Sequence, residues 1–374
     1  MKGSVVKKGN KYYVVLYMGR RSDGKKDYKW YSGYSSKKEA DDGLAELRKA
    51  AKDKTLVDNN SITVKEFLDL WIKDYVEPNL AANTADRSRF AVNCAEPVIG
   101  NIKIQKLEPY QIQQWVNKMN EGHLSKSSVR AYYSSIKSAF SKAVSWRIIS
   151  MSPCVDITLP KEKKKAMNTL TSSEVTKLLE QAGEHPFRLV LLLAASCGLR
   201  RGEILGLRWR QVDMENQIMH LSENYTQSTK GIKLAELKSD SAYRAVNFGD
   251  AVKLALKEQR TRQMQALTSD NIVDITSIME ESLRDLHVCT WYDLRPFRPD
   301  FASTKCRELI EAAGITKIRF HDLRHTHATL LLIAGVHPKV VQERLGHAKI
   351  TITLDRYSHV LPSMQKEASQ LLNF

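Results

Sequence analysis

Cysteine is scarce in this chain, and its distribution excludes two common ways of stabilising a fold. Five cysteines occur in 374 residues, an odd number, and they are widely scattered without any Cys-x-x-Cys pair. Neither a disulfide framework nor a thiolate zinc site is therefore expected. We expect reduced thiols, most of them buried. The five are Cys94, Cys154, Cys197, Cys289 and Cys306.

Long apolar runs are also missing. No segment approaches the roughly 20 apolar residues that cross a bilayer, and no signal sequence is visible at the N-terminus. The chain also has no Gly-x-x-x-x-Gly-Lys-Ser/Thr loop for nucleotide phosphates and no obvious cluster of acids for magnesium. We therefore expect a cytoplasmic protein that makes no use of a membrane.

Negative charge is in the minority. The chain has 58 Lys and Arg against 42 Asp and Glu, a formal net charge of +16, and a sequence pI near 9.5. Basic residues are spread along the whole length, which suits a polyanion, and nucleic acid is the usual one. The length allows two or three domains, each with its own core.

Residues 1–55 are predicted to form a small three-stranded sheet backed by a helix. Aromatic and β-branched runs at 12–18 and 28–34 predict strands. The helix begins at Ser36, whose hydroxyl can cap it while Glu39 reaches back. Basic residues interleave with tyrosines and a tryptophan. This pattern fits either a solvated hairpin or a strand pair that lies in a DNA groove, and we favour the second. The candidate DNA contacts are Lys7, Lys8, Lys11, Arg20 and Arg21.

Residues 62–155 are predicted to form an all-helical domain of about four helices. Thr63 and Glu66 form a capping box at its start, and no strand-like alternation follows. The helix at 126–146 carries four cations outside its apolar stripe, a pattern that fits either a solvated face or phosphate contact. They are Lys126, Arg130, Lys137 and Lys142.

A proline-punctuated basic stretch at 156–169 has linker composition, and residues 170–374 are predicted to form the last domain. Thr171 and Glu174 cap its first helix, and a nearly all-apolar helix follows at 187–195. Strand-like pieces occur at 217–222, 232–238 and 243–248, followed by helices. The prediction is a multidomain α+β fold whose C-terminal domain is mainly helical with a small antiparallel sheet.

Two arginine-containing motifs suggest phosphate chemistry, because a guanidinium meets two phosphate oxygens at once and keeps its proton. Arg200 follows Gly198, which can take a left-handed helix cap. Its alternative role is a structural ion pair with Glu203. His321 and Arg324 lie three apart at the start of a predicted helix and therefore share a face.

A zinc site is the competing interpretation of the histidines in this helix. His321, His325 and His327 are close in sequence, but His327 lies off the face that the other two share. Zinc also needs further ligands in suitable geometry. We expect His325 and His327 to pack or to hydrogen-bond within the helix instead.

A third motif begins with a helix that Pro338 opens and Gly346 closes, so that His347 follows the helix end. Tyr357 comes ten residues later. A tyrosine hydroxyl has a reference pKa of about 10 and needs a neighbouring base or cation to become a good nucleophile.

In combination these motifs resemble a known family. Gly-Leu-Arg-x-x-Glu at 198–203, His-x-Leu-Arg-His-Thr at 321–326, Leu-Gly-His at 345–347 and Tyr357 are similar, in order and spacing, to the signature boxes of the tyrosine recombinase (phage integrase) family. More loosely, the N-terminal sheet and the helical middle resemble domains of integrases from Gram-positive temperate phages and conjugative transposons. By this resemblance 1–55 is an arm-type DNA-binding domain, 62–155 a SAM-like core-binding domain and 170–374 the catalytic domain with a C-terminal tail helix.

The resemblance implies a role for each matching residue. Tyr357 becomes the nucleophile that forms a 3′-phosphotyrosyl link, while Arg200 and Arg324 hold the non-bridging oxygens. His321 assists proton transfer, and His347 bonds the phosphate in the transition state.

The family also uses a lysine on a β-hairpin as an acid for the 5′ oxygen. We assign this role to Lys238, with Lys230 and Lys233 as rivals. The sequence departs from many relatives by Cys197 in place of threonine and by the additional Arg201, and neither position is expected to do chemistry.

Beyond the site, the resemblance implies that the protein recombines double-stranded DNA at attachment sites, in the integration and excision of a mobile element. It also implies that a homotetramer carries out the reaction and that strand exchange proceeds through a Holliday junction. A DNA-bending accessory protein or an excisionase is a possible further partner. No cofactor is expected, since the phosphotyrosine conserves the energy of the broken bond. The tail helix packs in cis or on a neighbouring protomer. The alternatives are a catalytically silent DNA-binding regulator and a type IB topoisomerase-like relaxing enzyme.

Overall fold

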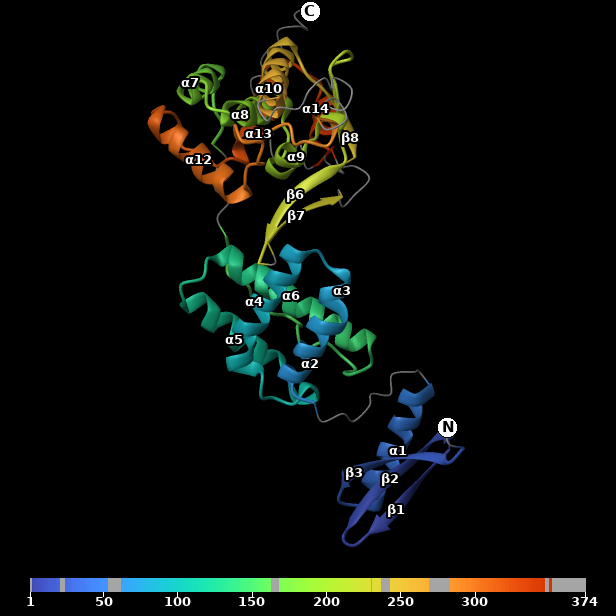
Figure 1. The fold of residues 1–374 in the computed structure, drawn as a ribbon. Helices are drawn as coiled ribbons and strands as arrows, with labels where there is room; N and C mark the ends of the chain where they lie inside the picture. Colours follow the sequence, from blue (N-terminus) through green and yellow to red (C-terminus); the bar gives the residue numbers. More distant parts are fainter. Residues whose placement is uncertain are drawn as a thin grey trace, which may run out of the picture. The chain divides into compact units, whose positions relative to one another are not determined.

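The computed structural model describes residues 2–20, 24–52, 62–162, 168–229, 231–236, 243–268, 283–346 and 350–351. The chain forms two compact units, 1–163 and 164–374. Figure 1 shows a sheet with one helix, a helical middle and a mixed C-terminal part, which confirms the predicted multidomain α+β fold. The finer domain boundaries stay predictions. Among the described helices none is long and apolar enough to span a membrane.

The N-terminal sheet has three antiparallel strands in the order β1-β2-β3. These are β1 (Gly3–Lys8), β2 (Lys11–Arg20) and β3 (Lys26–Tyr34), and α1 (Lys37–Lys52) covers one face. Val14 and Leu16 pack with Leu44 of the helix in a small core. The Ser36 hydroxyl accepts a hydrogen bond from the Glu39 amide at 3.1 Å, as predicted. The Glu39 carboxylate, however, reaches one residue further back, to the amide of Ser35 at 2.8 Å.

The helical middle contains the four main helices that the sequence predicts. They are α2 (Val64–Trp71), α4 (Ala82–Ile99), α5 (Pro109–Glu121) and α6 (Lys126–Ser145). A π-helical turn (Ile72–Val76) and the short α3 (Glu77–Asn79) extend α2, and a 3-10 turn (Ile104–Lys106) precedes α5. The predicted capping box of Thr63 and Glu66 is present. Trp71, Trp115 and Phe140 are fully buried at the centre, so this bundle has a core of its own.

The helices of the C-terminal unit form its bulk. They are α7 (Ser172–Ala182), α8 (Phe187–Cys197), α9 (Arg201–Gly206), α10 (Asp250–Thr268), α12 (Pro299–Ala312), α13 (Asp322–Ile333) and α14 (Pro338–Leu345). Thr171 and Glu174 form the predicted capping box of α7. Every residue of α8 except Arg188 and Ser196 is buried, which explains its nearly continuous apolar sequence.

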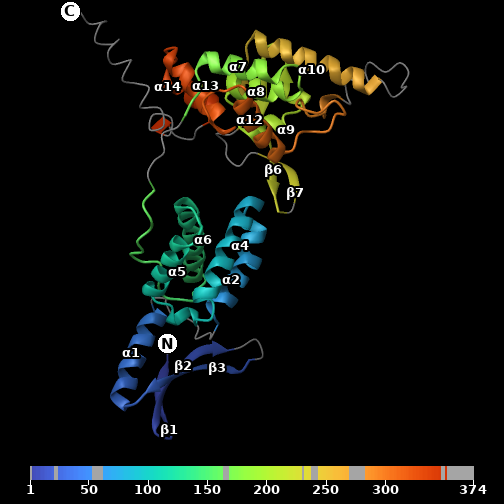
Figure 2. The same cartoon turned by 90° about the vertical axis from the view of Figure 1, so that its left-hand side faces the viewer.

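The strands of this unit form two small sheets where one was predicted. A 3-10 turn (Trp209–Gln211) leads into β4 (Val212–Asp213), which joins β5 (Ile218–Leu221) and β8 (Arg244–Asn247) in one sheet. β6 (Glu223–Ser228) pairs with β7 (Gly231–Glu236) as a separate hairpin. Figure 2 shows this hairpin projecting beyond the helices of the unit. β6 was missed because its polar sequence Glu-Asn-Tyr-Thr-Gln-Ser lacks the apolar alternation of a half-buried strand.

Candidate active site

The end of α8 sets the first part of the site. Gly198 has φ +65° and ψ 25°, the left-handed cap that the sequence predicts. A Cβ atom here would lie 2.5 Å from Cδ2 of His327, so space as well as conformation requires glycine. The Gly198 carbonyl accepts a hydrogen bond from Nη1 of Arg324 at 2.6 Å. The cap thus brings two of the predicted motifs together.

Arg200 lies at the N-terminus of α9 and contacts Glu203 twice. Its amide donates to one carboxylate oxygen at 2.8 Å, and its Nη1 donates to the other at 2.6 Å. The structural ion pair considered from the sequence is therefore present. The Arg200 side chain nevertheless remains 36% exposed, while Glu203 is 1% exposed. The guanidinium can thus meet a further anion on its open side.

A residue that the sequence motifs did not single out shares the same carboxylate. Arg244, on β8, donates to the two oxygens of Glu203 at 3.0 and 2.9 Å. Burial raises the pKa of Glu203, but the hydrogen bond from Arg244 and the positive charges of Arg244 and Arg200 outweigh it and hold that pKa at about 2. Glu203 is therefore ionised at neutral pH.

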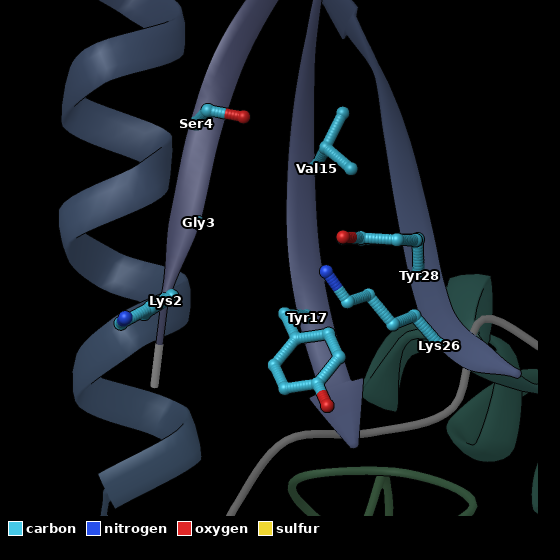
Figure 3. A pocket seen from close by; sticks show the side chains of 7 residues that line it. All are labelled: Lys2, Gly3, Ser4, Val15, Tyr17, Lys26 and Tyr28. Atoms are coloured by element: carbon cyan, nitrogen blue, oxygen red, sulfur yellow. The ribbon is translucent and has the colours of Figure 1, made fainter. Parts of the chain in front are cut away.

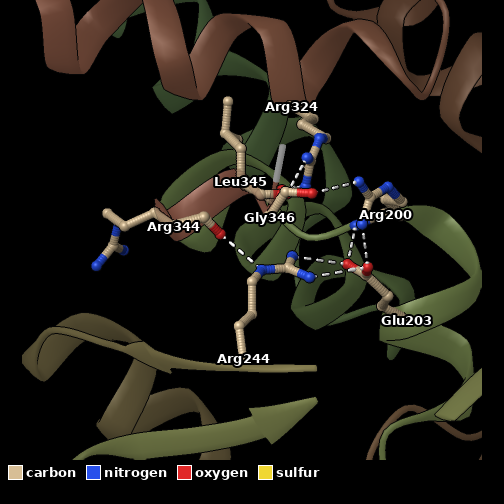
Figure 4. A network of polar contacts seen from close by, with 8 residues as sticks. Arg200, Glu203, Arg244, Arg324, Arg344, Leu345 and Gly346 are labelled. Carbon is tan, nitrogen blue, oxygen red and sulfur yellow. Dashed lines mark hydrogen bonds and ion pairs between the residues drawn. The ribbon is translucent and has the colours of Figure 1, made fainter. Parts of the chain in front are cut away.

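Three arginines converge on three consecutive carbonyls at the C-terminal end of α14 (Figure 4). The carbonyl of residue 344 accepts from Nε of Arg244 at 2.7 Å, that of residue 345 accepts from Arg324, and that of residue 346 accepts from Arg200 at 3.3 Å. The last carbonyls of a helix lack partners within it and carry its negative dipole end, so cations are favoured there. Gly346 closes α14 in the left-handed conformation, as predicted.

Arg324 is the most enclosed of the three. Its side chain lies on α13 and the residue is 2% exposed. Burying a cation is costly unless hydrogen bonds or an anion meet it. The Gly198 and Leu345 carbonyls accept from it without contributing a formal negative charge. These two partners therefore orient the guanidinium and leave its charge in place.

The histidines of α13 divide into different environments. His321, at the N-cap, is exposed, and its ring lies 5.1 Å from that of His325 in a perpendicular arrangement. His327 is buried and packs, which is one of the two roles expected for it, and its Nδ1 lies 3.0 Å from the carbonyl of Ala195 in α8. Burial and then the nearby charge of Arg344 lower the pKa of His327 to about 4. Among the described residues no three His, Cys, Asp or Glu side chains are grouped to hold a metal ion.

The remaining predicted site residues lie outside the described part of the chain. These are the nucleophile candidate Tyr357, His347, and Lys238 with its rival Lys230; Arg21 and the tail helix also lie outside it. Lys233 is described, and it lies exposed on β7. The structure thus places Arg200, His321 and Arg324 in one unit, while the roles of all these residues stay predictions.

The basic candidates of the N-terminal sheet are exposed along its strands. Lys7, Lys8, Lys11 and Arg20 all reach the surface. On the sheet face away from α1, Trp30 meets Tyr13 edge-on at 6.2 Å, and the Lys8 ammonium lies 5.5 Å from the Trp30 ring. Figure 3 shows the residues that line a pocket on the sheet, which are Lys2, Gly3, Ser4, Val15, Tyr17, Lys26 and Tyr28.

The cations of α6 are not equivalent. Lys126, Arg130 and Lys137 are exposed, although Arg130 also donates to the carbonyl of Pro160 at 3.2 Å. In contrast, the Lys142 ammonium lies 4.3 Å from the centre of the Tyr75 ring, so this side chain packs within the helical bundle.

Comparison with known protein families matches three segments of the chain. The phage integrase family matches residues 168–364, the N-terminal SAM-like domain of phage integrases matches 63–120, and an arm DNA-binding domain matches 4–51. The integrase match alone spans more than half of the sequence.

Similar proteins cover nearly the whole chain. A XerC-like tyrosine recombinase of Caldanaerobacter subterraneus subsp. tengcongensis is 27% identical over 100% of this chain and 98% of its own. The ICEBs1 integrase of Bacillus subtilis is 24% identical over 91% and 90%. Among solved structures, the Tn1549 transposon integrase in complex with transposon right end DNA has a TM-score of 0.69, with 20% identity, over 84% of this chain and 100% of that one. At this identity the structural likeness establishes the fold.

Proposed function

The chain belongs to the phage integrase family and is a tyrosine-type site-specific recombinase, and from this premise we propose that it cuts and rejoins DNA through a 3′-phosphotyrosyl intermediate at Tyr357. The biological process we propose is integration and excision of a prophage or other mobile element. The observation that supports this best is the convergence of Arg200 and Arg324 on the carbonyls that directly precede His347.

The proposed reaction is an in-line displacement at one phosphate. The Tyr357 oxygen forms a bond to phosphorus as the bond to the 5′ oxygen breaks, and the 3′ phosphate becomes attached to the enzyme. Negative charge builds on the two non-bridging oxygens, where preorganised cations are worth most. Arg200 and Arg324 suit this role because both guanidiniums are already oriented by carbonyl groups.

Proton transfer completes the step. A tyrosine loses its proton as it attacks, and exposed His321, beside the helix that carries Arg324, is the group that we propose to assist. Lys238 is proposed to give a proton to the departing 5′ oxygen, and His347 to bond the phosphate. Rejoining is the same step in reverse with the 5′ hydroxyl of another strand. The bond energy is kept in the phosphotyrosine, so the proposal requires no nucleotide cofactor.

We further propose that unit 1–163 supplies DNA affinity. The exposed cations of β1 and β2 and of α6 suit phosphate contacts, and the match to an arm DNA-binding domain supports the first of these. The partners proposed are double-stranded attachment sites and, for complete strand exchange at the nucleoid, three further copies of the chain. One solved relative, the lambda integrase, is a tetramer bound to a Holliday junction.

The test is covalent capture on nicked DNA. Purified protein is incubated with a duplex that carries the candidate attachment sequence and a nick placed so that a short fragment diffuses away after cleavage. Denaturing gels are run beside Tyr357→Phe, both in the presence of a chelator. The expected result is a protein-linked DNA band with the native protein alone.

The other outcomes identify the alternatives. If the native protein binds the duplex specifically yet forms no covalent band, the catalytically silent regulator is the better description. If the band forms but supercoiled plasmid is relaxed without exchange between two sites, the topoisomerase-like activity is supported instead.

A further inference from the structure

Two arginines share one buried carboxylate in the catalytic unit. Glu203 accepts hydrogen bonds from Arg200 and from both terminal nitrogens of Arg244. The Arg244 side chain is 7% exposed, against 36% for Arg200, so Arg244 is the inner member of the pair. A one-to-one pair of Arg200 with Glu203 would have no net charge. With Arg244 added, the cluster keeps a net positive charge, and its exposed part belongs to Arg200.

Arg244 also contacts the helix end that holds the other arginines. Its Nε donates to the carbonyl of Arg344, next to the carbonyls that accept from Arg324 and Arg200. One planar guanidinium therefore joins the buried acid to the last turn of α14, as Figure 4 shows. A lysine ammonium has no such fork and cannot make all three contacts with the same geometry.

We propose that Arg244 is a positioning residue of the recombinase: by taking up the charge of Glu203 and fixing the end of α14, it leaves Arg200 charged and directed at the DNA phosphate. This inference rests on the proposed function, because it assigns Arg200 to the reacting phosphate. Arg244 itself is too enclosed to be given a place against the DNA, and it acts through Arg200 and through the segment that leads to His347.

The first experiment measures single-turnover cleavage of the nicked substrate at saturating protein. Arg244→Gln is expected to slow cleavage on the order of 100-fold, because a reacting group misplaced by about 1 Å costs that much, with DNA binding nearly unchanged. Arg244→Lys keeps the buried charge but loses the forked guanidinium. Its cleavage rate should therefore lie between that of the native protein and that of Arg244→Gln. Arg295→Gln is the matched control, since it removes an equal charge from an arginine that is 80% exposed and pairs with Asp293.

The deciding variant removes both charges. Glu203→Gln/Arg244→Gln lacks the carboxylate that would otherwise neutralise Arg200, so cleavage should recover at least tenfold over Arg244→Gln alone. A residue that merely held the fold together would give a double variant as slow as the single one or slower. That result, or an Arg244→Gln protein that cleaves at the native rate, would overturn the proposal.

A second readout needs no cleavage and separates this inference from the proposed function. Inorganic phosphate should raise the melting temperature of the Tyr357→Phe protein by binding the arginine cluster. Arg244→Gln should raise the half-saturating phosphate concentration about tenfold, and the double variant should restore it. If the native protein forms no covalent band but this pattern appears, the proposed function fails and the role of Arg244 stands. If phosphate stabilises all variants equally, the role of Arg244 is refuted.

Discussion

Replacing Gly198 by alanine tests how closely two of the predicted site motifs are packed against each other. The substitution adds one Cβ to a residue at φ +65°, and that atom would lie 2.5 Å from Cδ2 of His327 and 3.1 Å from Cδ2 of Leu345. The left-handed conformation costs about 1 kcal/mol for a residue with a side chain, and overpacking a tight core adds about 1–3 kcal/mol. The sum is about 3 kcal/mol.

The control is a glycine with the same backbone conformation and no crowding. Gly335, after α13, has φ +79°, and a Cβ there would meet nothing within 4 Å. Gly335→Ala should therefore cost only the conformational part, about 1 kcal/mol. For a unit of this size, 1 kcal/mol corresponds to about 2–4 °C in melting temperature. Gly198→Ala should thus lower the melting temperature of the C-terminal unit by about 6–12 °C.

The same substitution should reduce cleavage, because the Gly198 carbonyl holds Arg324. Thermal unfolding followed by calorimetry measures the stability, and the nicked-DNA assay measures the rate at a temperature where each variant is folded. If Gly198→Ala lowers the melting temperature no more than Gly335→Ala does, the close approach of the His327 ring to Gly198 that we describe is refuted. Recovery of stability on adding His327→Ala would locate the clash in that ring.

Three further predictions follow from other contacts. The pKa of His327 falls from 6.5 to about 4 on folding, so as pH falls the unfolded chain takes up a proton there before the folded chain does. The free energy of unfolding should therefore decline by about 3 kcal/mol as pH falls from 6.5 to 4. Urea unfolding of His327→Gln should lack this part of the decline. Thr171→Ala removes the α7 capping box and should cost about 1 kcal/mol, measured by calorimetry; a cost near zero would contradict the capping. Replacing Lys7 and Lys8 by glutamine should reduce the slope of log binding constant against log salt by about two, and an unchanged slope in a gel-shift titration would exclude them from the DNA contact.

Local signals made much of the fold predictable. Thr63 and Thr171 indicate where helices begin. The hydroxyl of each threonine and the carboxylate of the glutamate three residues later accept hydrogen bonds from backbone amides of the first turn, which would otherwise have no partner within the helix. Gly198 and Gly346 likewise mark helix ends through a conformation that other residues avoid. Such features depend on neighbours a few residues apart, so they can be read without the tertiary structure.

The parts that escaped prediction depend on distant partners. Arg244 lies 41 residues from Glu203 and 100 from the carbonyl of Arg344, and nothing in its local sequence indicates either contact. His327 bonds Ala195 across 132 residues, which sequence spacing within one helix does not reveal. β6 forms a strand through pairing with β7 rather than through an apolar face. The sequence motifs indicated Arg200, Arg324 and the pairing of Arg200 with Glu203, but the carbonyls that orient both arginines became apparent in three dimensions.

The three carbonyls at residues 344–346 also set an order of events for a chain made from its N-terminus. Arg200 and Arg244 are synthesised long before their acceptors, 146 and 100 residues further along the chain. A nascent chain that ends before α14 therefore lacks these acceptors, even where its N-terminal unit has already folded. Chains interrupted before α14 lack the acceptors altogether, so any such fragment is incapable of the strand cleavage that we propose for the finished protein.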